Sequence, residues 1–485
     1  MSLFIRNGRI AEISPSSAAL TSQLPGASIL DASERIILPG FVNAHYHGES
    51  FLLHTFTGRR AFASWPTLTP YHDAVARLIG ATPEPLLEAL STVAGSAHIR
   101  HGTTCVGEFP LAYPAPRLDA ARAGYALAGI RHTAVLQTWD QIEGTRDQRP
   151  QGDNRVLVSL GKEDDYTIYS FENHTRVSRE RRIPLCAHIA EQPGEVERLR
   201  RNFKKSPLAV LKEYGALNPD TQVIHGNHLG PRDLAVLRTT GATLTLCPLS
   251  ASAKRTGYSL LACLPNTDIR MSIGTDWGGT DMMAEVKLLR MLPNLVGGVP
   301  HFSPTELLRM ATINGARALG LDAQIGSLEV GKRADLIMLS TEIAGFPPGR
   351  ANLSPEEIAA TVVDQLDRGA ITDVLVDGNF VFREGRPVSG GGDTTRQREA
   401  YQTLRSAFLR PGAPALDGTT RKSSPLLPSA KEGFLPGFTS PAGEDRPFSS
   451  RGAGAAAEDS AAHDEGAKPI ELPRGVKKIF GENDY

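Results

Sequence analysis

Short apolar runs recur through the middle of the chain and alternate with longer segments. The runs have three to five residues each and are bounded by turn residues, which is typical of strands buried in a parallel sheet: 41–44, 103–106, 133–136, 155–159, 183–187, 222–224, 242–246 and 271–273. Most segments between them are long enough for a helix, and Pro85–Arg100 and Glu195–Tyr214 have apolar residues at helical spacing. Strand and helix repeated eight times predict an α/β fold, a (β/α)8 TIM-like barrel. An open doubly wound sheet has the same alternation and stays open as the alternative. The polar segment 139–154 predicts a loop in place of one barrel helix.

Both ends of this region have the pattern of small β-elements. Gly, Pro and Ser separate short strands that we predict at 3–7, 9–13, 28–30 and 35–38, and again at 327–330, 334–339, 374–376 and 379–382. The sequence "VDGN" predicts a tight turn before the last of them. Two β-rich pieces at opposite ends predict one composite β-sandwich. We therefore expect residues 1–39 and 321–390 to form it together, around a barrel of residues 40–320.

The composition changes after about Ser389. Residues 394–409 predict a single helix, and from 410 onward Pro, Gly, Ala, Ser and charged residues dominate. Such a segment buries too little apolar surface to offset its ordering entropy. We expect residues 391–485 to be a helix followed by a disordered tail.

Composition and charge narrow the classes of partner. The 485 residues are 40% hydrophobic and 22% charged with a formal net charge of -1, so no basic surface for nucleic acid is expected, and a small molecule is the expected partner. No run approaches the roughly 18 apolar residues of a membrane span. The N-terminus does not resemble a signal peptide, and the four cysteines form no CxxC pair, so we expect a cytoplasmic protein. We also expect a homo-oligomer, a dimer, although no residue pattern carries this expectation.

Histidines and carboxylates stand where predicted barrel strands end. His45 and His47 share one side of an extended segment in "FVNAHYH". The other candidates are His188 after the fifth run, Glu191 three residues later, His225 after the sixth run and Asp276 after the eighth. The carboxyl ends of barrel strands converge, so we expect these side chains to lie together.

The residue types point to metal-assisted hydrolysis. Imidazole and carboxylate suit zinc or a similar first-row ion, and three histidines plus one aspartate leave a position for water. Zinc lowers the pKa of bound water toward about 7. Glu191, if it is not a ligand, can then carry protons to a leaving group. His225 can hydrogen-bond the attacking water or stabilise charge on it.

The motifs resemble those of the amidohydrolase superfamily. They are "LPGFVNAHYH", "HGTTCVGEF", "HIAEQPGEV", "VIHGNHL", "LCPLS", "GTDW" and "ATINGARALGLDAQIGSLEVGKRADLIML", which extend over the chain to about Val388. More narrowly, they are similar to the aminohydrolase/chlorohydrolase branch, with its guanine, cytosine and adenosine-type deaminases and triazine hydrolases. The resemblance implies a barrel with a β-sandwich made from both chain ends. It also implies one Zn or Fe ion on His45, His47, His188 and Asp276. By the same resemblance Glu191 is the proton shuttle, His225 an additional catalytic histidine, and Asp276 accepts a proton from the water.

Some positions depart from the pattern of the branch. Ser-Asn usually follows the Cys-Pro of the seventh strand, whereas Cys247 and Pro248 lead into "LSASAKRTG", and an Asn is commoner than Asp281. Trp277 can stack on a planar substrate or be wedged into the barrel wall. Dinuclear relatives use a carboxylated lysine on the fourth strand, but the run "NRVLVSL" has none, and Lys162 lies two residues beyond it.

These features predict a mononuclear metal-dependent aminohydrolase. We expect hydrolytic deamination of a small nitrogen-rich heterocycle at an amidine- or guanidine-like carbon. The same site could hydrolyse a C–Cl, C–OR or cyclic amide bond. The hypothesis from another class is a non-catalytic binding protein with a structural metal. Structural zinc sites are typically closed by four protein ligands and do not require the additional Glu191 and His225.

Overall fold

A computed structural model describes most of the chain up to residue 406. The described residues are 2–15, 27–48, 82–110, 115–137, 141–142, 156–160, 168–254, 256–257, 260, 264, 268–296, 301–346, 353–388 and scattered positions between 395 and 406. All of them belong to one unit of the chain, Met1–Thr419.

Eight parallel strands form the central sheet, in the order in which they follow one another along the chain. They are β4 (Phe41–Tyr46), β5 (Thr103–Glu108), β6 (Arg131–Leu136), β7 (Val156–Ser159), β8 (Leu185–Ile189), β9 (Gln222–His225), β10 (Thr243–Leu246) and β11 (Met271–Ile273). Each coincides with one of the predicted apolar runs. The strands are buried on both faces, which explains why they appear as short apolar runs without alternation. The α/β fold class is confirmed, and the open doubly wound alternative is wrong.

The first and last strands of the sheet meet and close it into a barrel. Tyr46 and Asp276 form a parallel bridge, and the amide of Asp276 donates to the carbonyl of His45 over 2.9 Å. Asn43 reinforces the junction, because its side-chain oxygen accepts from the backbone amide of Thr275 over 3.0 Å. A Cβ at Gly274 would lie 2.7–2.8 Å from Cβ, N and O of His45, so only glycine permits this approach. Closure therefore occurs beside the predicted metal ligands.

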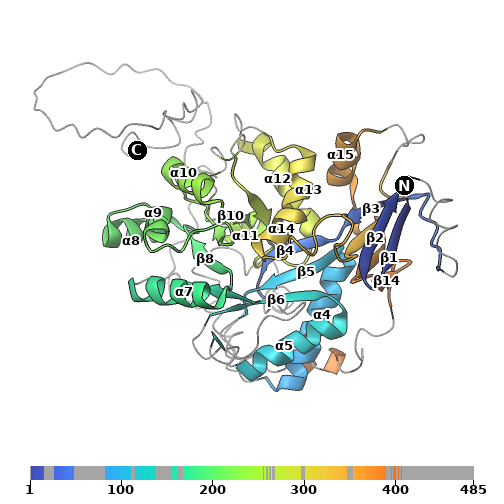
Figure 1. The fold of residues 1–485 in the computed structure, drawn as a ribbon, viewed down its shortest axis with the longest axis horizontal. Helices are drawn as coiled ribbons and strands as arrows, with labels where there is room; N and C mark the ends of the chain where they lie inside the picture. Colours follow the sequence, from blue (N-terminus) through green and yellow to red (C-terminus); the bar gives the residue numbers. More distant parts are fainter. Residues whose placement is uncertain are drawn as a thin grey trace, which may run out of the picture. The chain divides into compact units, whose positions relative to one another are not determined.

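Helices follow most of the strands (Figure 1). They are α4 (Glu84–Arg100), α5 (Ala115–Ala128), α7 (Ile168–Arg181), α8 (Pro193–Phe203), α9 (Pro207–Glu213), α10 (Pro231–Thr240), α11 (Pro248–Lys254), α12 (Met282–Val296), α13 (Pro304–Met310), α14 (Ile313–Ala318) and α15 (Pro355–Gln365). The helix predicted at 85–100 is α4. The single helix predicted at 195–214 is wrong, because α8 ends at a left-handed Lys204 (φ 54°) and α9 begins anew at Pro207. Apolar residues of these helices and of the strands form one large core.

A separate antiparallel sheet combines strands from distant parts of the chain. Its order is β15 (Arg386–Pro387), β14 (Asn379–Arg383), β13 (Ile371–Val376), β12 (Leu336–Ser340) and β3 (Arg35–Pro39), so β3 pairs with a strand some 300 residues later. β1 (Ser2–Arg6) and β2 (Arg9–Ser14) form a two-stranded sheet, and Figure 1 shows it beside β14 and β3. Asp377 and Gly378 both have positive φ and make the predicted turn before β14.

Two predicted strands are not formed. Residues 28–30 and 327–330 have no strand partner, and both segments have exposed apolar side chains: Ile29 is 75% and Val330 63% exposed. Each segment has only two apolar residues, which is too weak a signal when no neighbouring strand accepts the backbone hydrogen bonds. The chain passes from the antiparallel sheet to the barrel between Pro39 and Phe41. The domain boundaries themselves stay predictions.

A buried ion pair joins the barrel to the antiparallel sheet. Arg131 at the start of β6 donates from Nε and Nη2 to the two carboxylate oxygens of Asp335, both over 2.9 Å. Asp335 precedes β12 and also accepts the backbone amide of Asp377 over 2.8 Å. Both charged side chains are nearly inaccessible to solvent. This bidentate pair fixes the two sheets relative to one another.

Several expectations fall outside the described residues. These are the predicted loop at 139–154 (apart from residues 141–142), Lys162 and the disordered tail; of the predicted helix at 394–409 only scattered positions are described, and those are helical. Within the described residues, no helix has the length and apolarity that a membrane span requires.

Candidate metal and catalytic site

The six predicted site residues lie together at the carboxyl end of the barrel. His45 lies near the end of β4, and His47 directly follows that strand. His188 belongs to β8, and His225 is the last residue of β9. Glu191 and Asp276 lie two and three residues beyond β8 and β11. Each of the six residues is at most 9% exposed. In the sequence these six residues are spread over more than 200 positions. Closure of the barrel brings them together.

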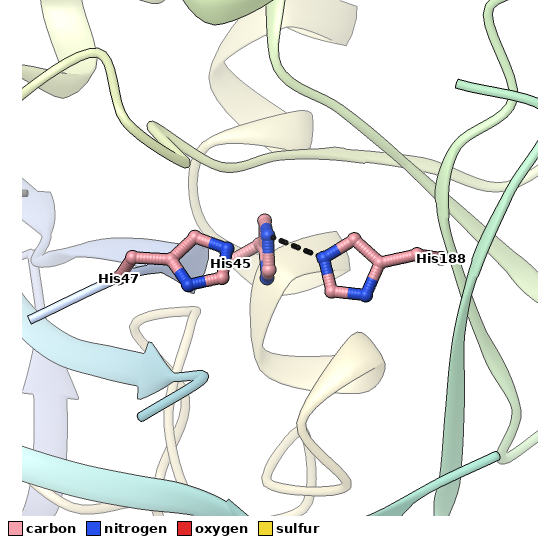
Figure 2. Close-up of side chains that lie close together, drawn as sticks. All are labelled: His45, His47 and His188. Carbon is pink, nitrogen blue, oxygen red and sulfur yellow. Dashed lines mark hydrogen bonds between the residues drawn. The ribbon is translucent and has the colours of Figure 1, made fainter. Parts of the chain in front are cut away.

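Three imidazoles converge on one point (Figure 2). Nε2 of His188 lies 3.2 Å from Nε2 of His45, and the rings of His45 and His47 are edge to face with centroids 4.9 Å apart. One nitrogen from each of the three histidines lies within 4.8 Å of the others, and a second such group is His45, His225 and Asp276. Ring nitrogens this close to one another can bind a single ion.

The donor atoms at this centre fit a divalent ion. Oδ1 of Asp276 lies 3.3 Å from Nε2 of His45 and 3.1 Å from Nε2 of His47, yet it accepts no hydrogen bond of good geometry from the described residues. Both ring nitrogens of His225 are buried without a hydrogen-bond partner among the described residues. Buried polar atoms in proteins are nearly always satisfied, so a cluster of unsatisfied polar atoms is a strained arrangement without a ligand. Three imidazoles and one carboxylate are a set of ligands that zinc binds.

Burial keeps the histidines in the neutral form that binds metal. It lowers the pKa of His45 to about 3, against the opposing attraction of the neighbouring Asp276 carboxylate. It lowers the pKa of His188 well below the ordinary value, and His45 and His225 beside it act in the same direction. The pKa of His225 is also lowered by burial. All three rings are thus deprotonated at neutral pH and can act as ligands or hydrogen-bond acceptors.

The two carboxylates stay ionised although they are buried. Burial alone would raise the pKa of Asp276, but the Lys254 ammonium and the histidines outweigh it and hold that pKa well below the ordinary value. Burial likewise opposes ionisation of Glu191, and His225 and Lys254 outweigh it and lower the pKa. An ionised Glu191 can accept a proton, which is what a proton carrier requires.

Lys254 is a site residue that the sequence analysis missed. Its ammonium donates to Oε1 of Glu191 over 2.9 Å and to Oδ2 of Asp276 over 2.6 Å. It comes from the end of α11, inside the segment "LSASAKRTG" that departs from the family pattern. That departure was the available signal, but most lysines in such loops are solvated.

The backbone of the site is held in uncommon conformations. His225, Asp276 and Ala190 all have positive φ, at 71°, 47° and 52°. Non-glycine residues in this region cost free energy and gather at functional sites. Glu195 of α8 holds the segment after β8, because its two carboxylate oxygens accept the backbone amides of Ala190 (3.2 Å) and Glu191 (2.9 Å). Glu191 is thereby fixed relative to His188.

Aromatic rings line the cluster of histidines. The Phe109 ring lies edge to face on His188 at 4.4 Å between centroids. Trp277 is 2% exposed, with its ring 5.8 Å from that of His47 and the Lys254 ammonium 5.1 Å away. This enclosure favours the interpretation of Trp277 as part of the barrel wall. Asp281, which departs from the family pattern, accepts the amides of Met283 and Ala284 and caps the start of α12.

Comparison with known proteins gives a family match over most of the barrel and the antiparallel sheet. The model of the amidohydrolase family matches residues 36–381. The chain is 27% identical over 399 residues to the 5-methylthioadenosine/S-adenosylhomocysteine deaminase of Moorella thermoacetica, covering 79% of this chain and 89% of the relative. It is 26% identical over 439 residues to the 5'-deoxyadenosine deaminase of Methanobrevibacter smithii, covering 84% and 93%.

Solved structures share the fold. An adenosine deaminase from Xanthomonas campestris with bound zinc superposes with a TM-score of 0.70 at 23% identity, covering 83% of this chain and 92% of that one. An atrazine chlorohydrolase from Arthrobacter aurescens, a mutant complexed with zinc and atraton, gives 0.68 at 17% identity, covering 83% and 94%. Identities this low bear on the fold alone.

Proposed function

The chain belongs to the amidohydrolase family, and from that premise we propose that it is a mononuclear metal-dependent deaminase of adenosine-like compounds. The observation that carries the proposal is that the buried Glu191 lies beside the clustered histidines and Asp276 but belongs to neither group of potential metal ligands. A non-catalytic metal protein would not need such a carboxylate. The relatives at 26–27% identity are named as deaminases of adenosine derivatives, and this supports the substrate class.

The adenine ring suits the chemistry of the site. Its amino group is attached to an amidine-like carbon, the kind of carbon that a water-derived nucleophile attacks in hydrolytic deamination. We propose that His45, His47, His188 and Asp276 hold one divalent ion, zinc or alternatively iron. Such an ion, when bound, lowers the pKa of water toward about 7.

The residues of the chain then have separate tasks. Asp276 accepts a proton from the attacking water, and His225 holds that water by a hydrogen bond. The water oxygen adds to the amidine carbon, which becomes tetrahedral before the C–N bond breaks. Glu191, with Oε2 3.8 Å from Nε2 of His225, accepts the other proton of the water and delivers it to the amino nitrogen, which leaves as ammonia. The proton held by Asp276 passes to the ring nitrogen of the product. Positioned acid–base groups of this kind contribute on the order of 100- to 10,000-fold in rate.

Ammonia release from a substrate panel tests the proposal. The panel contains adenosine, 5'-deoxyadenosine, 5'-methylthioadenosine, S-adenosylhomocysteine, guanine, cytosine, and a chloro- and an alkoxy-triazine. We expect ammonia and the matching inosine product from at least one adenosine derivative. Chloride or alcohol release from the triazines without ammonia from any compound would favour the C–Cl or C–OR alternative. No turnover of any compound by metal-loaded protein would favour a binding protein.

Cytoplasmic location and the dimer remain predictions, and sedimentation of the purified protein tests the latter.

A further inference from the structure

Lys254 occupies a place in the site that the chemistry above does not require. Its side chain is 1% exposed, and its ammonium lies between a carboxylate from the β8 end and a carboxylate from the β11 end. Trp277 covers the ammonium from a third direction, 5.1 Å from the ring centroid. A lysine buried to this degree is stable only where its charge is paired.

The two carboxylates use their oxygens in the same way. Lys254 binds Oε1 of Glu191 and Oδ2 of Asp276, and the Ser250 hydroxyl also donates to Oδ2. The other oxygen of each carboxylate points to the histidines. Oδ1 of Asp276 lies within 3.3 Å of two imidazole nitrogens, and Oε2 of Glu191 is 3.8 Å from a nitrogen of His225.

We propose that Lys254 is a positioning residue that ties the proton carrier to the ligand carboxylate, leaving one oxygen of Glu191 and one of Asp276 directed at the metal and water. Without the ammonium, each carboxylate could rotate and present either oxygen, and the two negative charges would repel each other. Its part in turnover rests on the proposed function, whereas its part in metal binding does not.

The surrounding backbone holds Lys254 in register with Glu191. Asn227 donates from Nδ2 to the carbonyl of Glu191 over 3.2 Å and to the Thr256 hydroxyl over 3.0 Å, which joins the segment after β8 to the segment that carries the lysine. On the other side of α11, the amide of Leu249 donates to the buried Glu285 over 2.8 Å. α11 is therefore anchored at both ends, and the backbone position from which the Lys254 side chain extends is fixed.

An anion-binding role for Lys254 fits these contacts poorly. The ammonium already donates to two carboxylates and its side chain is 1% exposed, so little of its charge is available to a further anion. A substrate group would also have to displace one of the two short hydrogen bonds. The geometry therefore favours positioning over direct recognition of a substrate carboxylate or phosphate.

The test compares Lys254→Met and Lys254→Gln with wild type. Met keeps the length of the stem and removes the charge, and Gln keeps a hydrogen-bond donor without charge. Lys287→Met is the matched control, because Lys287 on α12 donates to the backbone carbonyl of Leu366. Zinc affinity is measured by competition with a chromophoric chelator, and the visible spectrum of the cobalt-substituted protein reports the ligand geometry. Thermal unfolding of each metal-loaded variant reports folding, and kcat and KM are measured at saturating zinc.

We expect Lys254→Met to weaken zinc binding by about 10- to 100-fold, the usual effect of removing a group that orients a ligand. We also expect an altered cobalt spectrum, a kcat at least tenfold lower and a KM within about threefold of wild type. Lys254→Gln should fall between the two, and the control should match wild type.

Three outcomes would overturn the proposal. One is zinc affinity and kcat within twofold of wild type in a folded Lys254→Met, which would leave only a structural ion pair. Another is an increase in KM at constant kcat, which would make Lys254 a substrate-binding residue. If Lys254→Met does not fold, unchanged zinc affinity in Lys254→Gln has the same meaning. The zinc measurements need no substrate, so they remain decisive even if the wild type deaminates nothing in the panel.

Discussion

Replacing Glu191 by Gln is the sharpest perturbation of the proposed mechanism. The two side chains have the same shape, and the change removes one negative charge and the ability to carry a proton. Glu191 contacts Lys254 at 2.9 Å and His225 at 3.8 Å and belongs to neither group of potential metal ligands. We therefore expect Glu191→Gln to keep its metal and to bind substrate while turning over far more slowly.

The contacts give a magnitude for each effect. Removal of a positioned acid–base group lowers kcat by on the order of 100- to 10,000-fold. The cost in folding free energy is smaller, because Lys254 keeps its 2.6 Å bond to Asp276 and the Gln amide oxygen can still accept from it. A hydrogen bond to a charged group contributes about 1.5–3 kcal/mol, and weakening one predicts a loss of at most about that size. Folding and metal binding should therefore survive the change.

The assay measures three quantities on the same sample: ammonia release, bound metal by elemental analysis and the midpoint of thermal unfolding. His188→Ala is the contrasting variant, because it removes a proposed ligand and should empty the metal site. Near-wild-type turnover in Glu191→Gln, or loss of its metal to the extent seen in His188→Ala, would refute the assignment of Glu191 as proton carrier.

Three further predictions follow from other parts of the structure. Purified protein should hold about one divalent ion per chain and lose activity on chelation, and elemental analysis that finds two ions would contradict the mononuclear site. Arg131→Met should lower the free energy of unfolding by about 3–5 kcal/mol, because it leaves the buried Asp335 charge unpaired; a denaturant midpoint equal to that of wild type would show that the pair contributes nothing. Burial lowers the pKa of His45 to about 3, against an ordinary value of 6.5, so the stability it contributes is present above about pH 6.5 and is lost as pH falls toward 3. Denaturant titrations of metal-free protein between pH 7.5 and 5 should give a slope steeper than that of His45→Asn by up to about 1.4 kcal/mol per pH unit, and equal slopes would contradict the shift.

The pattern of short apolar runs was sufficient to predict the strands of the barrel. Each of the eight apolar runs forms a strand, since strands covered on both faces must be apolar along their whole length. The positions of His188, His225 and Asp276 at or just beyond strand ends followed directly, because a barrel directs the ends of its strands to one face. Their individual roles remain predictions.

The sequence predicted less well where a structure depends on partners far away. Ile29 and Val330 lie in short apolar segments that form no strand, since no neighbouring backbone pairs with them. The break between α8 and α9 depends on the left-handed conformation of Lys204, which a helical pattern does not register. Both errors concern segments in which a few residues give the only local signal.

The sequence by itself determined the alternation that builds the barrel and the residue types that suit one divalent ion. Only the tertiary structure decided that β4 and β11 meet at Tyr46 and Asp276, and that Lys254 lies buried between Glu191 and Asp276. The physical reason is that a side chain's charge and burial depend on every element packed against it. A lysine at the end of a short helix has the pattern of a solvated residue, and here it is enclosed by the carboxylates of two residues that are 63 and 22 positions away along the chain.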